Sequence, residues 1–581
     1  MRKYSLLFFF IALYVTAAAQ NKTYCNPVNI DYGYTPIPNF SEWGRHRATA
    51  DPVIVLYKND YYLFSTNQWG YWWSSDMNNW HFISKKFLRP WNGNVYDELC
   101  APAVGIIGDT MIVFGSTYTS KFTIWMSTDP KANEWKPLVD SFAIGGWDPA
   151  FFTDDDGRVY MYNGSSNRYP LYGIELNRKT FQPIGTRVET YSLESWRYGW
   201  QRFGEYMDNT FLDPFLEGSH MTKHNGKYYL QYCAPGTEMS GSADGVIIGD
   251  GPLGPFTPQS DPFSFKPGGF IRGPGHGSTY TDKWNNYWHT STLGINVKNT
   301  FERRIGIWPA GFDKDGVMYM DAAFGDYPTY LPDGPADHLK GKFTGWMLLN
   351  YKKPVMVSST LGSHYPNNAV DESIKTYWSA ASADKGEWIQ TDLGNISTVN
   401  AIQINYADQD VDSNRLGKWS NQFHQYKLYV SVDGKKWTVL ADKSNNKTDV
   451  PHDYVELAAP VQARFIKMEN IHMPTGKFAI SGLRVFGNGN GSKPAAVEQF
   501  YVLRTEKDKR SAWIKWKPVE NAYAYNIYFG TEPGKLYNCI MVHDANEYYY
   551  KGMDLAKTYY YSIEALNENG VSEKTKTSKV E

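Results

Sequence analysis

Three acidic residues begin similar stretches of this chain, and acids in such an arrangement can do hydrolytic chemistry. Asp51 begins DPVIVLYKNDYYLFST, Asp148 begins DPAFFTDDDGRVYMYNG and Glu217 begins EGSHMTKHNGKYYLQYC. In each stretch a short apolar run, a tight turn and a tyrosine-rich run predict a β-hairpin. Carboxylates at the same end of repeated hairpins converge if the repeats surround one axis. Two or three converging carboxylates are what hydrolysis of a glycosidic bond requires.

The hairpin pattern recurs in two further stretches, CAPAVGIIGDTMIVFGST from Cys100 and GPGHGSTYTDKWNNYWHTST from Gly273. With repeat starts at residues 51, 101, 148, 217 and 273, the spacings are 50, 47, 69 and 56 residues. Strand-built periods of about 40–50 residues are typical of propeller blades. The sequence therefore predicts a five-bladed β-propeller over residues 23–348. The hairpin FDKDGVMYMDAAF from Phe312 is assigned to the outer half of blade five, with a sixth blade as the alternative.

A chain of 581 residues is too long for one core, so several domains are expected. The sequence after the propeller predicts two further β-domains. From Tyr351 onward, short alternating strands predict an antiparallel β-sandwich over residues 351–487. The polar, glycine-rich GNGNGSKPAA predicts a flexible linker over residues 488–496. Residues 497–581 predict a second, smaller sandwich. The fold class is therefore all-β.

The first 19 residues have the pattern of a secretion signal. Arg2 and Lys3 precede an apolar run over residues 6–13, and alanines at 17–19 offer a cleavage site. We expect export to the periplasm or the extracellular space. The apolar run is too short to span a bilayer, and no transmembrane segment is expected. A formal net charge of −2 with no charged tail argues against nucleic acid as a partner. Four cysteines without a CxxC pair are expected to be buried thiols, with one disulfide as the alternative.

The segments ATADP, GWDPAFFTDDDG, EGSHMTKHNGKYYLQY and GPGHGS together resemble glycoside hydrolase family 43, a family of five-bladed propellers. The resemblance extends over residues 24–348. It implies an inverting mechanism with Asp51 as general base, Glu217 as general acid and Asp148 as a third acid that raises the pKa of Glu217. Asp51 must stay ionised, so we expect it in a polar, solvated place. This chemistry requires no cofactor, and the expected partner is an oligo- or polysaccharide substrate.

The same resemblance implies roles for residues of the fifth blade. His276 is expected to face the propeller axis and to coordinate a central ion or a water, and the alternative is a hydrogen-bonded core histidine. One of Arg303 and Arg304 is expected to pair with the third acid, Asp148, and to contact substrate. The other is expected at the surface.

Two tryptophans near the acids, Trp69 and Trp147, are expected to have different roles. Trp69 follows the first hairpin and is the candidate for stacking on a sugar ring. Trp147 directly precedes Asp148, and neighbouring strand residues face opposite ways. We therefore expect Trp147 in the core.

The first sandwich resembles the discoidin (coagulation factor 5/8 type C) module, which is also seen among family 32 carbohydrate-binding modules. Asp371 and Thr376 match part of the calcium site of that module. Ser481 and Gly482 stand where a calcium-binding glutamate is often found, and loss of a carboxylate weakens an all-oxygen site. A structural calcium is therefore only an alternative. The WKPVENAYAYNIY and YYYSIEALNENGVS segments of the last domain are similar to fibronectin type III domains.

The combined expectation is an exported, inverting exo-glycosidase that removes terminal α-L-arabinofuranosyl residues from plant polysaccharide or glycan side chains. β-D-Xylosides are the closest alternative substrate, followed by galactosides and galactofuranosides, because loops choose the sugar. An alternative of another class is a non-catalytic, glycan-binding propeller. The presence of all three acids argues against it. The sequence does not indicate the oligomeric state.

Overall fold

The protein is described by a computed structural model that covers residues 22–34, 46–66, 68–85, 87, 99–116, 123–142, 144–337, 340–412 and 422–581. The expected secretion signal lies outside these residues. The described chain is built from strands, with two single-turn 3-10 helices, η2 (Gly199–Gln201) and η3 (Pro366–Ala369). Within these ranges, no helix has the length and apolar character needed to cross a bilayer.

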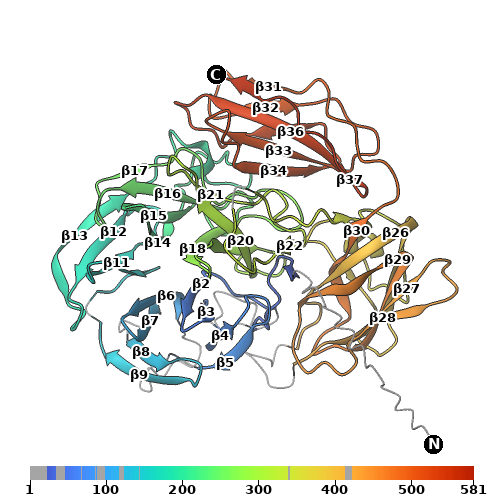
Figure 1. Ribbon diagram of the computed structural model, residues 1–581, viewed down its shortest axis with the longest axis horizontal. Helices are drawn as coiled ribbons and strands as arrows, with labels where there is room; N and C mark the ends of the chain where they lie inside the picture. Colours follow the sequence, from blue (N-terminus) through green and yellow to red (C-terminus); the bar gives the residue numbers. More distant parts are fainter. Residues whose placement is uncertain are drawn as a thin grey trace, which may run out of the picture.

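Five antiparallel sheets of four strands each surround a common axis (Figure 1). Within each sheet the strands follow chain order from the axis outward. The blades are β2 (Val53–Tyr57), β3 (Asp60–Phe64), β4 (Gly70–Ser74) and β5 (His81–Ser84); β6 (Cys100–Ile107), β7 (Thr110–Ser116), β8 (Ile124–Asp129) and β9 (Glu134–Val139); β10 (Ala150–Thr153), β11 (Val159–Asn163), β12 (Leu171–Leu176) and β13 (Pro183–Tyr191); β14 (Glu217–His224), β15 (Lys227–Ala234), β16 (Ala243–Gly249) and β17 (Phe256–Pro258); and β18 (Gly275–Thr281), β19 (Tyr287–Gly294), β20 (Arg303–Phe312) and β21 (Met318–Met320).

The five innermost strands close into a ring. Strands β2, β6, β10, β14 and β18 neighbour one another in that order, and β18 contacts β2. The N-terminal segment lies between the fifth and first blades, since Val28 N–H donates to Ile305 O of β20 and the Trp72 indole of β4 donates to Asp31. β21 is the outer strand of the fifth sheet, as predicted for the hairpin from Phe312. The described residues thus form five blades.

The innermost hairpins owe their turns to residues that tolerate a left-handed backbone. β2 and β3 are joined by Lys58 and Asn59, both with positive φ, and β14 and β15 by Asn225 and Gly226, also with positive φ. Two successive positive φ angles match the twist of the flanking strands. The turn sequences KND and HNG therefore fix the hairpin registers.

The second domain is a sandwich whose strands run in the order β23-β30-β26-β29-β27-β28, with β24 on β26 and β25 on β30. Its strands are β23 (Met347–Leu348), β24 (Val355–Val357), β25 (Trp378–Ser379), β26 (Trp388–Tyr406), β27 (Gln425–Ser431), β28 (Thr438–Asp442), β29 (His452–His472) and β30 (Ala479–Asn488). Because β23 pairs with β30, the sandwich begins a few residues before the predicted boundary at Tyr351.

The second domain is joined to the propeller by buried ion pairs. Arg47, four residues before Asp51, pairs with Asp408 at 2.6 Å and with Asp449 at 3.0 Å. These charged side chains are at most 4% exposed. Breaking such a pair by removing one partner leaves an uncompensated buried charge. The second domain therefore braces the chain segment that leads into Asp51.

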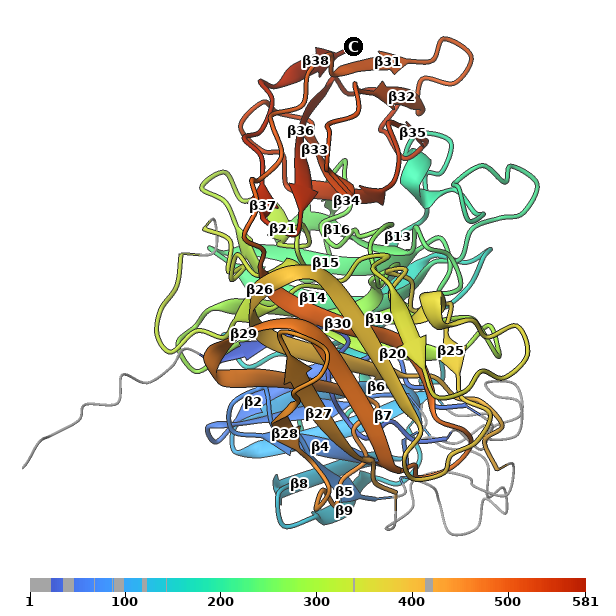
Figure 2. The same ribbon diagram turned by 90° about the vertical axis from the view of Figure 1, so that its right-hand side faces the viewer.

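The third domain is a second sandwich, built from a three-stranded sheet and a five-stranded sheet. The first contains β31 (Tyr501–Arg504), β32 (Ala512–Lys515) and β35 (Glu547–Tyr550), and the second contains β33 (Ala524–Gly530), β34 (Asn538–His543), β36 (Tyr559–Asn567), β37 (Gly570–Val571) and β38 (Ser578–Val580). Its likeness to fibronectin type III domains stays a prediction. It sits on the edge of the propeller, beside β16 and β21, in both views (Figures 1 and 2).

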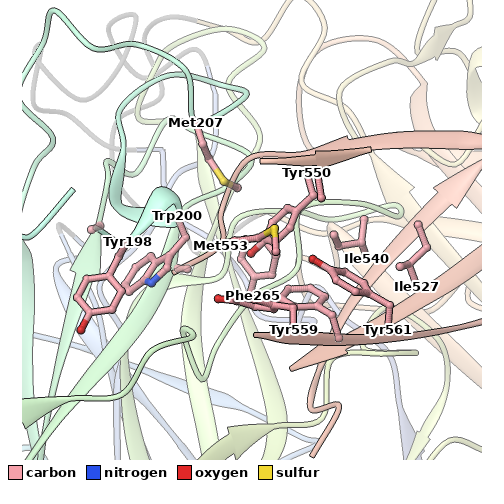
Figure 3. Packing of buried hydrophobic residues seen from close by; sticks show 14 of the residues in the cluster. Tyr198, Trp200, Met207, Phe265, Ile527, Ile540, Tyr550, Met553, Tyr559 and Tyr561 are labelled. Atoms are coloured by element: carbon pink, nitrogen blue, oxygen red, sulfur yellow. The ribbon is translucent and has the colours of Figure 1, made fainter. Parts of the chain in front are cut away.

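The third domain and the propeller share one apolar core. Tyr198 and Trp200 of the propeller lie in the same cluster as Met553 and Tyr559 of the third domain (Figure 3). The segment predicted as a flexible linker, residues 488–496, is hydrogen-bonded to the third domain. Gly489 N–H donates to Glu568 O, Gly491 N–H donates to Asn569 Oδ1, and the Asn567 side-chain amide donates to Ser492 O. These bonds make the linker part of the third domain's surface.

The four cysteines are all buried thiols, as expected from the sequence.

Candidate active site

The residue that begins each blade has a backbone conformation that turns the chain toward the axis. Asp51, Ala101, Asp148, Gly218 and His276 have φ angles of 52°, 42°, 53°, 70° and 51°. Left-handed backbone is uncommon for residues other than glycine and is retained where the surrounding structure enforces it. Four of these five positions are occupied by residues with side chains, and three of those side chains are titratable.

Glu217 lies one residue before the blade position that Asp51 and Asp148 occupy. The comparison of the repeats, which placed all three acids at the same position, is therefore corrected. It pairs with Cys233 and is followed by a bulge, as are Cys100 and Gly275 at the starts of β6 and β18. The true equivalent of Asp51 is Gly218. A Cβ there would lie 3.0 Å from the His276 ring, a tight contact that favours glycine at this left-handed position. The carboxylate of this blade therefore comes from the preceding residue.

A ring of hydroxyl groups holds the blade starts. Thr66 Oγ1 accepts the N–H of Ala101, Ser116 Oγ accepts that of Asp148, and Thr292 Oγ1 accepts that of Asp51. Each hydroxyl lies at or near the end of a second strand and binds the start of the next blade around the ring. These three hydroxyl residues were not predicted from the sequence, although FST, GST and TST stand at or near the ends of three hairpins.

Asp51 is kept ionised by its partners rather than by solvent, contrary to expectation, and is only 8% exposed. Thr66 donates to Asp51 Oδ2 at 2.5 Å. His276 Nδ1 lies 3.3 Å and Arg303 Nη1 lies 3.6 Å from Asp51 Oδ1. Burial acts to raise the pKa of Asp51, but His276, Arg303 and the Thr66 hydroxyl outweigh it and lower that pKa below its ordinary value.

Glu217 has the opposite titration behaviour. Burial and the nearby Asp148 raise the pKa of Glu217 to about 8, and burial also raises the pKa of Asp148. The Glu217 and Asp148 side chains form a hydrogen bond, and a hydrogen bond between two carboxyl groups needs a proton on one of them. Ser165 Oγ donates to Glu217 Oε2 at 3.2 Å. The site thus contains a charged Asp51 and a protonated Glu217 at neutral pH, the pattern of an acid–base pair.

His276 faces the axis between the acids, as expected, but in a cationic form. Burial alone would lower its pKa, yet Asp51, Asp148 and Glu217 raise it to about 9. Its backbone N–H donates to Asp244 Oδ1 at 2.7 Å. Asp148, Glu217 and His276 each place a ligand atom within 4.8 Å of the others. A metal ion there would have to displace the protons of Glu217 and His276. Because metal ligands bind in their deprotonated form, this group could hold an ion that takes the place of those protons, and the acid–base chemistry itself needs none.

The two arginines of β20 point to different places. Arg303 faces Asp51 and donates to Thr237, so it pairs with the first acid rather than with Asp148. Arg304 donates to Arg47 O at 2.6 Å and to His452 of the second domain at 2.9 Å. Arg303 and Arg304 differ because successive residues of a strand face opposite sides of the sheet. The expectation that Arg304 either contacts substrate or lies at the surface is wrong, because it is buried between two domains.

The tryptophans also differ from expectation. Trp147 is 39% exposed and does not lie in the core. It occupies the same place before a blade start as Glu217, whose side chain reaches the site. Its exposed ring beside Asp148 makes it a candidate sugar-stacking residue that the simple alternation rule missed. Trp69 is partly buried beside a small pocket lined by Phe64, Leu99 and Pro102. Its stacking role stays a prediction.

The calcium alternative in the second domain has little support from the geometry. Asp371 Oδ1 accepts the N–H of Ser373, and Oδ2 accepts the hydroxyl of Thr376. A Cβ on Gly482 would lie 2.8 Å from the ring of Phe270 in the propeller, so no glutamate fits there. Within the described residues, the one cluster of at least three His, Cys, Asp or Glu ligands is the axial one. The calcium site at Asp371 and Thr376 stays a prediction.

A five-bladed propeller with a low-pKa and a high-pKa carboxyl group at its axis has the equipment for acid–base cleavage of a glycosidic bond. The sequence model described as glycosyl hydrolases family 43 matches residues 46–318, and that described as F5/8 type C domain matches residues 354–485. The propeller is thus a catalytic domain of glycosyl hydrolase family 43, and the first sandwich is an F5/8 type C domain.

Curated relatives are similar over part of the propeller. A beta-xylosidase of Xylanibacter ruminicola is 29% identical over 176 residues, 26% of this chain and 51% of the relative. An arabinoxylan arabinofuranohydrolase of Bacillus subtilis (strain 168) is 32% identical over 165 residues, 26% of this chain and 28% of the relative. The chain thus spans about half of the first relative and less than a third of the second. A solved structure titled glycoside hydrolase aligns at a TM-score of 0.44 and 19% identity, over 78% of this chain and 99% of that one.

Proposed function

We propose that this protein is an exported, inverting exo-glycosidase that removes terminal α-L-arabinofuranosyl residues from plant polysaccharide or glycan side chains. The observation that carries the proposal is the axial cluster of Asp51, Asp148 and Glu217 around His276, in which the surroundings raise the pKa of Glu217 and lower that of Asp51. The F5/8 type C domain would bind carbohydrate beside the propeller. Export rests on the N-terminal sequence pattern.

Each carboxyl group has one task in the proposed reaction. Asp51 takes a proton from a water as that water attacks the anomeric carbon. Glu217 donates its proton to the glycosidic oxygen as the bond to the leaving group breaks. Asp148 keeps that proton on Glu217 by repelling negative charge. His276 and Arg303 keep Asp51 charged in a buried place, and no cofactor is required.

The rate should depend on pH through Glu217. A general acid works only in its protonated form, so kcat/KM on an oligosaccharide should fall as the pH rises through about 8. Because the pKa of Asp51 is lowered, its protonation should cause no loss above pH of about 4. A pH series with an unactivated arabino-oligosaccharide measures both limbs. A descending limb near the ordinary glutamate pKa of about 4.3 would contradict the role of Glu217 as general acid.

The choice of sugar is the finer part of the proposal. Relatives named arabinoxylan arabinofuranohydrolase favour arabinofuranosides, and one named beta-xylosidase makes β-D-xylosides the second candidate. A screen of 4-nitrophenyl glycosides of arabinofuranose, xylose, galactose and galactofuranose should give the highest kcat/KM on the arabinofuranoside. Fastest release from xyloside would reassign the substrate. Inactivity on all four, together with binding on a glycan array, would support the non-catalytic alternative.

The stereochemical outcome is tested separately. Direct attack by water at Asp51 inverts the anomeric centre. Proton NMR during the first minutes of hydrolysis should show the inverted anomer before mutarotation. First appearance of the retained anomer would rule out Asp51 as a base acting through water.

A further inference from the structure

The connection from β13 to β14 leads directly into Glu217, and its base is rigidly held. We call residues 192–216 the acid loop. Trp200 and Gln201 within it are fully buried. The Gln201 amide donates to the hydroxyls of Tyr191 and Tyr232, at 2.9 and 2.8 Å. The base of the acid loop is therefore part of the core of blades three and four.

The third domain fastens the acid loop from outside. Gly199 N–H donates to Met553 O, and Arg202 donates to Lys551 O at 2.7 Å. Arg197 pairs with Asp554, whose side chain is fully buried, at 3.2 Å. Figure 3 shows Trp200 and Met553 next to one another in the shared core. Contacts from both domains thus fix where the loop emerges.

The tip of the acid loop exposes large apolar side chains. Tyr206, Phe211 and Leu212 are 72%, 95% and 57% exposed. Tyr169, 68% exposed, lies on the neighbouring connection from β11 to β12, which bridges to the acid loop through Ser166 and Leu216.

This exposure is concentrated at one end of the propeller. In the described part of the chain, five of the eight exposed aromatic side chains lie on segments beside Asp148 and Glu217, namely Trp147, Tyr169, Trp196, Tyr206 and Phe211. The other three are Tyr365, Tyr501 and Trp513. Exposed apolar residues gathered beside a site mark an interaction surface rather than a structural need.

We propose that the tip of the acid loop, with Tyr206, Phe211 and Leu212, binds the leaving-group part of the substrate, a saccharide chain. The inference rests on the proposed function. A general acid must contact the oxygen of the leaving group, so the leaving group lies on the Glu217 side of the site. Aromatic rings present flat apolar faces, which suit the apolar faces of sugar rings. Because its base is already held, the loop loses little conformational freedom on binding.

The test compares a polymer with a small substrate. In Phe211→Ala and Tyr206→Ala, the ratio of kcat/KM on arabinoxylan to kcat/KM on 4-nitrophenyl arabinofuranoside should fall about 5- to 10-fold relative to the parent. Tyr501→Ala is the matched control, because Tyr501 is 47% exposed on the third domain. That control should keep the parent ratio.

Two results would overturn the subsite. One is an unchanged ratio in both loop variants, and the other is an equal fall in the Tyr501 control. If the parent protein hydrolyses neither substrate, the proposed function fails, and binding then tests the loop by itself. Affinity electrophoresis in arabinoxylan should still show weaker retardation of Phe211→Ala than of Tyr501→Ala. Equal retardation of the two variants would reject the loop as a saccharide-binding surface.

Discussion

Replacing Glu217 by glutamine is expected to lower kcat on unactivated arabino-oligosaccharides by about 10²–10⁴-fold, the usual contribution of general acid catalysis. Glutamine keeps the size of the side chain but cannot donate a proton to the glycosidic oxygen. The same change removes the group whose pKa of about 8 sets the descending limb of the pH profile. Initial rates on an oligosaccharide across a pH series measure both effects.

The leaving group provides the internal control for this variant. An activated aryl glycoside needs little protonation, so the loss on a 2,4-dinitrophenyl arabinofuranoside should be much smaller than on the oligosaccharide. The melting temperature should stay close to that of the parent, because the amide can still bond to Ser165 and Asp148. Full turnover of natural oligosaccharides by Glu217→Gln would disprove the assignment of the acid.

Ending the chain at residue 496 is expected to abolish soluble, active enzyme. The truncation uncovers Tyr198, Trp200 and Phe265, which are at most 1% exposed in the intact protein. It also removes Asp554 and leaves Arg197 without its ion-pair partner. Soluble yield, the melting temperature and kcat/KM measure the outcome.

A point variant distinguishes the loss of the Trp200 packing contacts from the loss of the whole third domain. Trp200→Ala should destabilise the intact protein by about 3–5 kcal/mol, the usual cost of truncating a buried large aromatic residue. Trp513→Ala, on the third domain, should lower the melting temperature by much less, because this side chain is 37% exposed. A truncated propeller with parental melting temperature and kcat/KM would show that the third domain is a passive appendage.

The features that could be predicted from the sequence are those encoded locally. Apolar runs, turn residues and tyrosine-rich strands repeat along the chain, so the hairpins and the five blades were accessible. Asp51 and Asp148 were placed at the axis because both begin a blade. Glu217 was found for a partly wrong reason, since it lies one residue before the position that Asp51 and Asp148 occupy, where this blade has Gly218 packed against the His276 ring.

The features that could not be predicted depend on partners far apart in the sequence. Nothing near Arg47 indicates that Asp408 and Asp449 will cover it, and nothing near Arg304 indicates His452. The ionised state of Asp51 was predicted correctly but attributed to solvent, whereas His276 and Arg303 supply the compensating charge. Such pairings are set by how whole domains pack, and local patterns do not record them.

The shared core of propeller and third domain also has a consequence for the order of events during synthesis. Arg197 of the acid loop is separated from Asp554 by 357 residues. At about 5–20 residues per second, the loop leaves the ribosome roughly 20–70 seconds before its partner. During that interval Trp200 has no third domain to cover it. The nascent propeller therefore waits with Trp200 uncovered until the third domain is made and packs against the acid loop.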